Sequence, residues 1–368
     1  MASTKNKKVV VAMSGGVDSS TALAILKEQG YDCIAVSMQL WDYSEKDDAT
    51  HTAGSCCSMD DIYDARHVAE GLGVPFYVVN AEDAFAEKVV ADFIEGYAKG
   101  LTPNPCIRCN EFLKFGLLLR KAALLGAGFL ATGHYARIEA GPAGFKLLKA
   151  VDPEKDQSYF LFTMTEEHLS KVLFPLGGLT KKEVRSMAKR LGLRTSDKPE
   201  SQEVCFVEDA RYGAFLSPRI SAGKGEIINS SGKVLGTHNG IFNYTIGQRK
   251  GLNLSGGPFF VTGIDAPNNR VVVGRIEELY SSGLIAEAVN WVSADARRAF
   301  EQAGTLTGVS VKLRYRHEGA TATLIKAGNG IVRVVFSEPQ KAVAPGQAAV
   351  FYIKEEVIGG GWIHKALK

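Results

Sequence analysis

The chain has 368 residues, of which 45% are hydrophobic and 23% are charged, and its formal net charge is +3. These proportions are ordinary for a globular protein and exclude a disordered, collagen-like or low-complexity chain. A single hydrophobic core rarely grows beyond roughly 250–300 residues, so we expect at least two domains. So small a net charge gives no reason to expect a nucleic-acid partner, although it permits a local basic surface.

No segment approaches the roughly 18 uninterrupted apolar residues of a membrane span. The apolar run near the N-terminus is short and ends in a glycine turn, which argues against a signal peptide. We therefore expect a cytoplasmic protein with no membrane partner. We also expect a monomer. In that compartment, cysteines favour thiol chemistry or metal binding over a disulfide framework. The chain has six cysteines: Cys33, Cys56, Cys57, Cys106, Cys109 and Cys205.

Short apolar runs alternate with helical patterns over the first 135 residues, which predicts βαβ units and a parallel sheet. The segment 165–195 is predicted to be helical and basic. Residues 171–198 carry eight Lys or Arg, a charge run that suits RNA phosphates but equally suits a solvated face. The predicted strands are 8–13, 33–40, 76–79 and 129–131, and the predicted helices before the basic segment are 21–29 and 60–72.

From about residue 207, glycine becomes frequent and β-branched residues alternate with polar ones. Hairpin turns are predicted at Asn229–Gly232, at 268–269 and at 329–330, and a half-buried strand at 309–316. The predicted fold class is α/β with three domains. They are an N-terminal parallel-sheet domain at 1–206 that includes the basic helical part, a small β-rich central domain at 207–276 and a C-terminal β-barrel or sandwich at 277–368.

A glycine-rich loop with the sequence SGGVDS, from Ser14 to Ser19, follows the first predicted strand. At the start of a helix, backbone N–H groups are unpaired and carry the positive end of the helix dipole, and two glycines let the backbone approach an anion. No lysine follows the glycines, so γ-phosphate transfer of the P-loop type is not expected. The alternative is a tight strand-to-helix turn in which serine and aspartate only cap the helix.

Cys106 and Cys109 form a C-x-x-C pair in a segment with two prolines, which predicts an extended loop. The spacing fits a redox pair, half of a zinc site or iron–sulfur ligation. Cys205 is the isolated candidate partner, unless it is a small buried hydrophobic residue. Arg108 is close enough in sequence to lower a thiol pKa. Structural roles are predicted for the other cysteines: Cys33, Cys56 and Cys57.

The glycine loop resembles the signature of the PP-loop ATP pyrophosphatase superfamily, whose members cleave ATP between the α- and β-phosphates. With the later motifs, the chain resembles the tRNA-specific 2-thiouridylase family (MnmA/TrmU) from residue 12 to about 352. These motifs occur in the family's order: TPNPCIRCN (102–110), GHYAR (133–137), KDQSYFL (155–161), SQEVCF (201–206), YTIGQRKGL (244–252) and RYR (314–316).

The resemblance implies an ATP-dependent sulfurtransferase that acts on the wobble uridine of tRNAs for lysine, glutamate and glutamine. The oxygen on carbon 2 would be adenylylated, and sulfur from a persulfide on Cys205 would replace it, giving 2-thiouridine, AMP and pyrophosphate. Cys109 would be the nucleophile and would form a disulfide with Cys205 as sulfur is released. The implied cofactors are ATP and Mg²⁺, and the implied sulfur donor is a cysteine desulfurase or a sulfur-relay protein.

The resemblance also implies two sets of binding residues. A target base must leave its stack, because the attacked carbon has to reach both ATP and sulfur. The residues implied for ATP are Ala12, Met13, Ser14, Gly15, Gly16, Val17, Asp18 and Ser19 at the phosphates, with Met38 and Gly133 beside the adenosine. The residues implied for tRNA are Asn104, Pro105 and Cys106 at the flipped base, and His134, Lys155, Asp156, Gln157, Arg314, Tyr315 and Gln347 elsewhere.

Cys106 departs from the family pattern, because many members have an aspartate at this position. If that aspartate is a general acid or base, a thiol with a pKa of about 8.5 has to replace it here. Alternatively, Cys106, Cys109 and Cys205 ligate a [4Fe–4S] cluster whose open iron binds the sulfide to be transferred. Two other function classes remain open: a PP-loop ligase or amidotransferase acting on a small molecule, and a non-catalytic RNA- or metal-binding protein.

Overall fold

The computed structural model describes residues 7–41, 59–142, 144–199, 204–207, 211–221 and 223–368. The predicted structural roles of Cys56 and Cys57 lie outside these residues. The chain divides into two compact units: residues 1–89, 106–210 and 355–357 form the first, and residues 90–105, 211–354 and 358–368 form the second. Across the described ranges, no helix combines the length and the apolar character needed to cross a membrane.

A five-stranded sheet lies in the first unit, with the order β3-β2-β1-β4-β7 and parallel neighbours throughout. This confirms the predicted parallel α/β domain. Val9, Val10 and Val11 are fully buried, as expected for a central strand that is covered on both faces. The strands are β1 (Lys8–Ala12), β2 (Asp32–Gln39), β3 (Phe76–Asn80), β4 (Phe129–Ala131) and β7 (Val172–Leu173).

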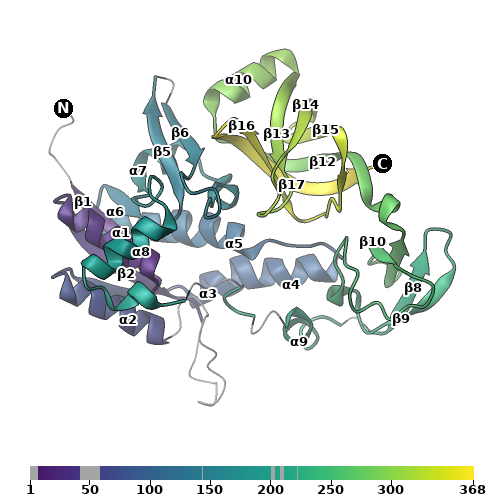
Figure 1. The fold of residues 1–368 in the computed structure, drawn as a ribbon, viewed down its shortest axis with the longest axis horizontal. Helices are drawn as coiled ribbons and strands as arrows, with labels where there is room; N and C mark the ends of the chain where they lie inside the picture. The colour runs from purple at the N-terminus through teal and green to yellow at the C-terminus, as the bar shows by residue number, and fades with distance from the viewer. Residues whose placement is uncertain (1–6, 42–58, 143, 200–203, 208–210, 222) are drawn as a thin grey trace. The chain divides into compact units, whose positions relative to one another are not determined.

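Helices α1, α2 and α8 pack against the sheet in one core that includes Val9 and Val11 of β1 (Figure 1). Helix α1 begins at Val17, earlier than the predicted residue 21, so the end of the glycine loop is the first helical turn. The helices of this unit are α1 (Val17–Glu28), α2 (Met59–Gly71), α3 (Glu82–Phe85), α6 (Leu119–Leu124), α7 (Glu166–Lys171) and α8 (Lys181–Arg190). Shorter elements are η2 (Ala86–Val90), η4 (Ser158–Leu161), η5 (Arg194–Asp197) and the hairpin β5 (Ala136–Gly141) with β6 (Gly144–Lys149).

Two segments differ from prediction. The basic segment is not one helical region, because β7 pairs with β4 between α7 and α8, and Pro175 disfavours a helical conformation at the preceding residue. The C-x-x-C segment is not an extended loop, because helix α5 (Pro105–Arg108) continues into the π-helix η3 (Cys109–Leu118). Proline is accommodated in the first turn of a helix, where its missing N–H would have no intrahelical partner.

The second unit is mainly β-structure. A four-stranded sheet with the order β10-β11-β8-β9 packs around Ile227, Val261 and Val271. Strands β12, β15, β14, β13, β16 and β17 pair in that order, and β12 also pairs with β17, which closes a six-stranded barrel. These findings confirm the predicted small β-rich part and the C-terminal barrel. The domain boundaries at 206 and 276 remain a prediction.

Each predicted hairpin turn connects two strands. Gly232 and Gly330 have φ angles of 84° and 69°, and Asn269 has a φ of 50°; these are left-handed conformations that glycine and asparagine tolerate best. The predicted strand 309–316 ends at Lys312. The strands are β8 (Gly225–Asn229), β9 (Val234–His238), β10 (Phe260–Asp265), β11 (Arg270–Gly274), β12 (Tyr280–Trp291), β13 (Thr305–Lys312), β14 (Ala320–Gly328), β15 (Ile331–Lys341), β16 (Ala348–Ile353) and β17 (Glu356–Leu367). The helical elements are α4 (Ala91–Ala98), α9 (Tyr212–Leu216), η7 (Ile241–Asn243), η8 (Ile276–Leu279) and α10 (Ala294–Ala303).

Candidate active site

The glycine loop lies at the carboxyl edge of β1, the middle strand of the parallel sheet. Strands β2 and β3 extend to one side of β1 and strands β4 and β7 to the other, so the chain direction across the sheet switches beside β1. Open α/β sheets bind ligands at such a switch point, outside the carboxyl ends of the strands. Met38 near the end of β2 and Gly133 just after β4 are on the two sides of the loop, where the adenosine is expected.

Close backbone approaches determine the shape of the loop. Gly15 has a φ of 70°, and a Cβ at this position would lie 2.2 Å from the carbonyl oxygen of Asp61. A Cβ at Gly133 would lie 2.8 Å from the backbone nitrogen of Ser19. Both positions therefore require glycine. Gly16, the N-cap of α1, provides no side-chain cap, which leaves the amides of the first turn suited to an anion.

Asp18 connects the glycine loop to distant parts of the first unit. Its carboxylate oxygens lie 2.7 and 2.8 Å from Nζ of Lys181, and the Tyr135 hydroxyl donates to Oδ1 at 2.7 Å. The Lys181 side chain is only 11% exposed, so its charge is directed into the unit rather than towards an RNA. Sequence reasoning missed this ion pair, because 163 residues separate its partners and Lys181 resembles the other cations of the basic segment.

Several cationic side chains of the basic segment 171–198 are already bonded to groups within the first unit. Lys198 Nζ lies 2.6 Å from carboxylate oxygens of both Asp61 and Asp64. Arg185 donates to the carbonyl oxygens of residues 196 and 198. The predicted tRNA-binding surface therefore depends on fewer cations than the sequence suggests. Lys171, Lys182, Lys189, Arg190 and Arg194 are exposed. Of these, Lys171 pairs with Glu167 and Lys189 pairs with Asp197.

Cys106 and Cys109 lie on successive helical segments, with Cys106 exposed and Cys109 half-buried. A spacing of three residues places two helical side chains on neighbouring positions of one face. Between them, Arg108 pairs with Glu111 at 3.2 Å, so a carboxylate already compensates its charge. In the part of the chain that the structure describes, no three His, Cys, Asp or Glu side chains are grouped so that they could hold a metal ion. Cys106, Cys109 and Cys205 are therefore not assembled as the donor set of a [4Fe–4S] cluster.

Cys205 lies in a turn and is half-buried. The ring of its neighbour Phe206 packs edge-to-face on Phe85, the last residue of α3, with 5.5 Å between centroids. Helix α3 also packs against η3, which begins at Cys109. One short helix therefore contacts the segments that carry both candidate catalytic cysteines. The pairing of Cys109 with Cys205 remains a prediction.

His134 follows β4 and is only 8% exposed. Its Nδ1 lies 2.6 Å from the hydroxyl of Thr132, and its Nε2 lies 3.4 Å from Nζ of Lys114. Burial, followed by the positive charge of Lys114, lowers the pKa of His134 well below its usual range, so the imidazole is neutral near pH 7. The predicted contact of His134 with tRNA is not tested by these contacts.

Two neighbouring residues with an expected tRNA contact also bond within the unit. Asp156 is buried and accepts hydrogen bonds from the backbone N–H groups of Ala150 and Ser158, both at 3.1 Å. Gln157 Oε1 accepts from the backbone N–H of Tyr135 at 2.9 Å. The bond from Gln157 holds Tyr135, the residue that directly follows the buried histidine. Lys155, the third member of this motif, is half-buried.

Gln347 of the second unit also has a structural partner. Its Nε2 donates to the carbonyl oxygen of Thr102 at 2.9 Å, two residues before Asn104 of the expected base-contacting run. A Cβ at Gly346 would lie 2.8 Å from the Thr102 nitrogen, so the two backbones approach closely. Gln347 therefore positions the chain that leads to Asn104 and Pro105. The other expected tRNA residues of this unit, Arg314 and Tyr315, are exposed and half-buried, respectively.

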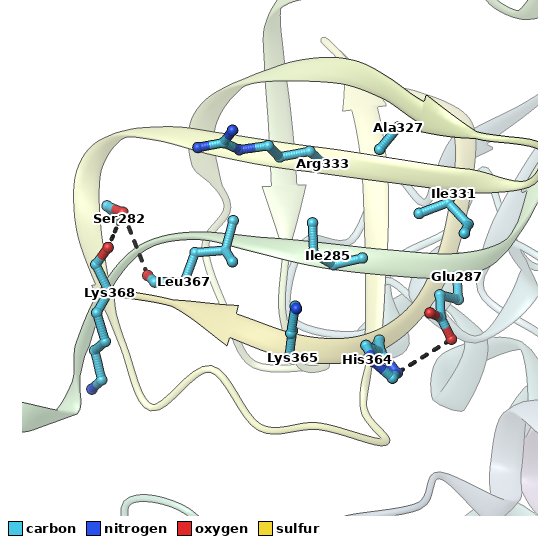
Figure 2. Close-up of a pocket in the computed structure, with 10 residues that line it drawn as sticks. All are labelled: Ser282, Ile285, Glu287, Ala327, Ile331, Arg333, His364, Lys365, Leu367 and Lys368. Atoms are coloured by element: carbon cyan, nitrogen blue, oxygen red, sulfur yellow. Dashed lines mark hydrogen bonds and ion pairs between the residues drawn. The ribbon is translucent and has the colours of Figure 1, made fainter.

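A separate cavity of about 560 Å³ lies on the outer face of the C-terminal barrel. Figure 2 shows Arg333, Ile285 and Lys365 in one row across β15, β12 and β17. At one end, Nδ1 of His364 lies 3.3 Å from Oε2 of Glu287. None of the residues expected to bind ATP or tRNA lines this cavity.

The fold and the glycine loop define a nucleotide-binding α/β domain that is followed by two β-domains. Three family models match the chain in this order. They are described as the tRNA methyl transferase HUP domain at residues 7–209, the tRNA methyl transferase PRC-barrel domain at 213–275 and the aminomethyltransferase beta-barrel domain at 281–363.

Relatives of similar length narrow this class. The tRNA-specific 2-thiouridylase MnmA of Geobacter metallireducens is 52% identical, over 100% of this chain and 99% of the relative. The proteins of the same name from Geotalea uraniireducens and Clostridium beijerinckii are 50% and 44% identical, over 99% and 98% of this chain and 96% and 99% of the relatives. The chain belongs to the tRNA-specific 2-thiouridylase family.

Proposed function

We propose that this protein is a tRNA-uridine 2-sulfurtransferase that uses ATP with Mg²⁺ to convert the wobble uridine of tRNAs for lysine, glutamate and glutamine into 2-thiouridine. The supporting observation is that one compact unit contains a glycine loop at the switch point of its sheet and, packed against its helix α3, the two segments that carry Cys109 and Cys205. The expected setting is the cytoplasm, with sulfur supplied by a cysteine desulfurase or a sulfur-relay protein.

The first step activates the base at the glycine loop. The loop from Ala12 to Ser19 binds the ATP phosphates, because the first-turn amides of α1 carry the positive end of the helix dipole. The oxygen on carbon 2 of uracil attacks the α-phosphorus, and pyrophosphate leaves with the bonding electrons. This converts a poor leaving group, a carbonyl oxygen, into an AMP leaving group.

The second step replaces that oxygen by sulfur. The terminal sulfur of a persulfide on Cys205 attacks carbon 2, and AMP departs with the oxygen. The thiolate of Cys109 then attacks Sγ of Cys205, which releases 2-thiouridine and leaves a disulfide between the two cysteines. An external thiol reductant supplies two electrons to reopen that disulfide. Thiolates suit this chemistry because they are strong nucleophiles near neutral pH.

In this proposal Asn104, Pro105 and Cys106 contact the flipped base. Cys106 is exposed in the helical turn before Cys109, so a substrate can reach this position, where many family members have an aspartate. No iron ligand is required of it.

The test uses the full-length protein purified under anaerobic conditions, with an unmodified tRNA transcript, ATP and Mg²⁺, and sulfur from a cysteine desulfurase with cysteine. We expect 2-thiouridine by nucleoside mass spectrometry and stoichiometric pyrophosphate. Cys205→Ser and Cys109→Ser should abolish 2-thiouridine formation. Cys33→Ala is the matched control, because Cys33 is 3% exposed in the core and burial raises its pKa to about 11.

Several outcomes would contradict the proposal. Thiolation by Cys205→Ser at the wild-type rate would exclude Cys205 as the sulfur carrier. Pyrophosphate release with a small-molecule acceptor and no thiolation would identify a ligase or amidotransferase. Binding of tRNA without pyrophosphate release would identify a non-catalytic protein. Iron and acid-labile sulfide that co-purify in proportion to activity would favour the three-cysteine cluster over the persulfide.

A further inference from the structure

Lys114 and Cys109 lie on the same side of η3 (Cys109–Leu118), which we call the cysteine helix, and the reason is the type of helix. Lys114 is five positions after Cys109, which in an α-helix would place their side chains roughly 140° apart. Residues 109–118 form a π-helix, in which residue i+5 bonds back to residue i, so the two positions stack on one side. The helix that presents Cys109 therefore also presents an ammonium group.

A buried imidazole holds this ammonium in place. Lys114 Nζ lies 3.4 Å from Nε2 of His134, and Nδ1 of the same ring lies 2.6 Å from the Thr132 hydroxyl. The ring is also fixed between Phe115 and Phe174, with centroid distances of 6.0 and 5.7 Å. Since the imidazole is neutral, we assign the ammonium as donor to Nε2 and the Nδ1–H as donor to the hydroxyl.

No carboxylate of the described residues pairs with the Lys114 ammonium. Among the described residues, its polar contact is the neutral His134. By contrast, Lys181 pairs with Asp18, and Lys198 pairs with two aspartates. Lys114 is thus a half-buried cation that remains available to an anionic ligand.

The position of Lys114 identifies the anion. His134 directly follows Gly133, whose backbone approaches Ser19 of the glycine loop, while Lys114 itself belongs to the helix that begins at Cys109. Lys114 therefore lies at the junction where the helix of Cys109 contacts the segment next to the glycine loop. During sulfur attack, the group that occupies this junction is the α-phosphate, since it is joined both to the adenosine and to the oxygen that leaves.

We propose that Lys114 binds the α-phosphate of the nucleotide and stabilises the charge on the AMP that leaves when sulfur attacks, with His134 as its positioning residue. This inference rests on the proposed function. An electrostatic contact that strengthens in the transition state typically contributes about 10²–10³ in kcat.

Two measurements test the proposal. The first measures, by calorimetric titration, the affinity of the wild-type protein, Lys114→Gln and Lys114→Arg for AMP and for adenosine. Lys114→Gln should weaken AMP binding about tenfold, the usual loss for a charged hydrogen bond, and leave adenosine binding unchanged, whereas Lys114→Arg should retain part of the AMP affinity. The matched control is Lys121→Gln, which removes an exposed lysine from the adjacent helix α6 and should leave AMP binding unchanged.

The second measurement is 2-thiouridine formation. We expect Lys114→Gln to lower kcat about 100-fold with little change in KM for tRNA, and His134→Gln to lower it less. A wild-type protein that makes no 2-thiouridine would overturn the proposed function, while the AMP titrations would still test the phosphate contact. Equal AMP affinities and equal kcat in Lys114→Gln and wild type would overturn this inference. It would also be overturned if the substitution left AMP binding intact and changed only the pH at which Cys109 is alkylated, because the ammonium would then act on the thiol.

Discussion

The glycine loop and the cysteine helix belong to the same compact unit but are built in opposite ways. Backbone contacts and an ion pair determine the loop: Gly15 and Gly133 have no room for a Cβ, and Asp18 pairs with the nearly buried Lys181. The cysteine helix is an irregular π-helix whose first residue is half-buried, and Cys106 just before it is exposed.

This difference matches what we propose that each region binds. Phosphate recognition by backbone amides requires those amides to be aimed before the ligand arrives, and tight glycine contacts achieve that. Sulfur transfer requires thiols that a donor protein and a flipped base can both reach, so exposure is necessary there. His134 and Lys114 lie where the two regions meet.

Breaking the ion pair should have the largest effect on the loop. Asp18→Asn leaves the Lys181 ammonium, 11% exposed, without its anionic partner, and we expect a loss of about 3 kcal/mol in the free energy of unfolding. Urea denaturation of the full-length protein measures this change. Asp197→Asn is the control, because its partner Lys189 is exposed and its removal should change stability much less. Equal losses in the two variants would refute the view that Asp18 anchors the loop.

Gly133→Ala should cost about 2 kcal/mol, the usual range for forcing a methyl group into a packed site. The new Cβ would lie 2.8 Å from the Ser19 nitrogen, so the glycine loop has to shift, and ATP affinity should fall with stability. Gly178→Ala is the matched control, since a Cβ there meets nothing within 4 Å. Thermal denaturation and ATP titration of both variants provide the comparison. Unchanged ATP affinity in Gly133→Ala would show that this contact does not shape the nucleotide site.

The smallest expected effect is a pH dependence at the junction of the two regions. In the unfolded chain the pKa of His134 is about 6.5, whereas burial lowers its pKa in the folded protein. Below that pH, the unfolded state binds a proton that the folded state does not. The free energy of unfolding should therefore decrease as the pH falls, by at most about 1.4 kcal/mol per pH unit for this group.

Denaturant titrations between pH 5 and 7 measure this slope. His134→Asn should reduce it, whatever its effect on stability at pH 7. The pKa of His168 is lowered as well, so His168→Asn is a useful comparison that should reduce the slope less, because that ring is less deeply buried. A slope that is identical in wild type and His134→Asn would mean that His134 is protonated in the folded protein.

The parallel sheet, the glycine loop and the hairpin turns could be predicted from the sequence because their signals are local. Buried strands appear as apolar runs, and turns at positions such as Asn329-Gly330 need residues that tolerate a positive φ. The three cysteines were also identified as candidates from their residue type and spacing. The conformation of the C-x-x-C segment was not, since two prolines fit an extended loop as well as a helix start, and the packing around η3 decides between them.

What the sequence by itself determined is therefore the set of chemical groups and the local backbone that carries them. Only the tertiary structure decided which groups meet. Lys181 pairs with Asp18, 163 positions away in the chain. The π-helix η3 also places Lys114 on the same side as Cys109, whereas α-helical periodicity would place it on another side. The physical reason is that ion pairs and helix irregularities depend on distances between segments remote in the chain, and no local pattern of residue types records those distances.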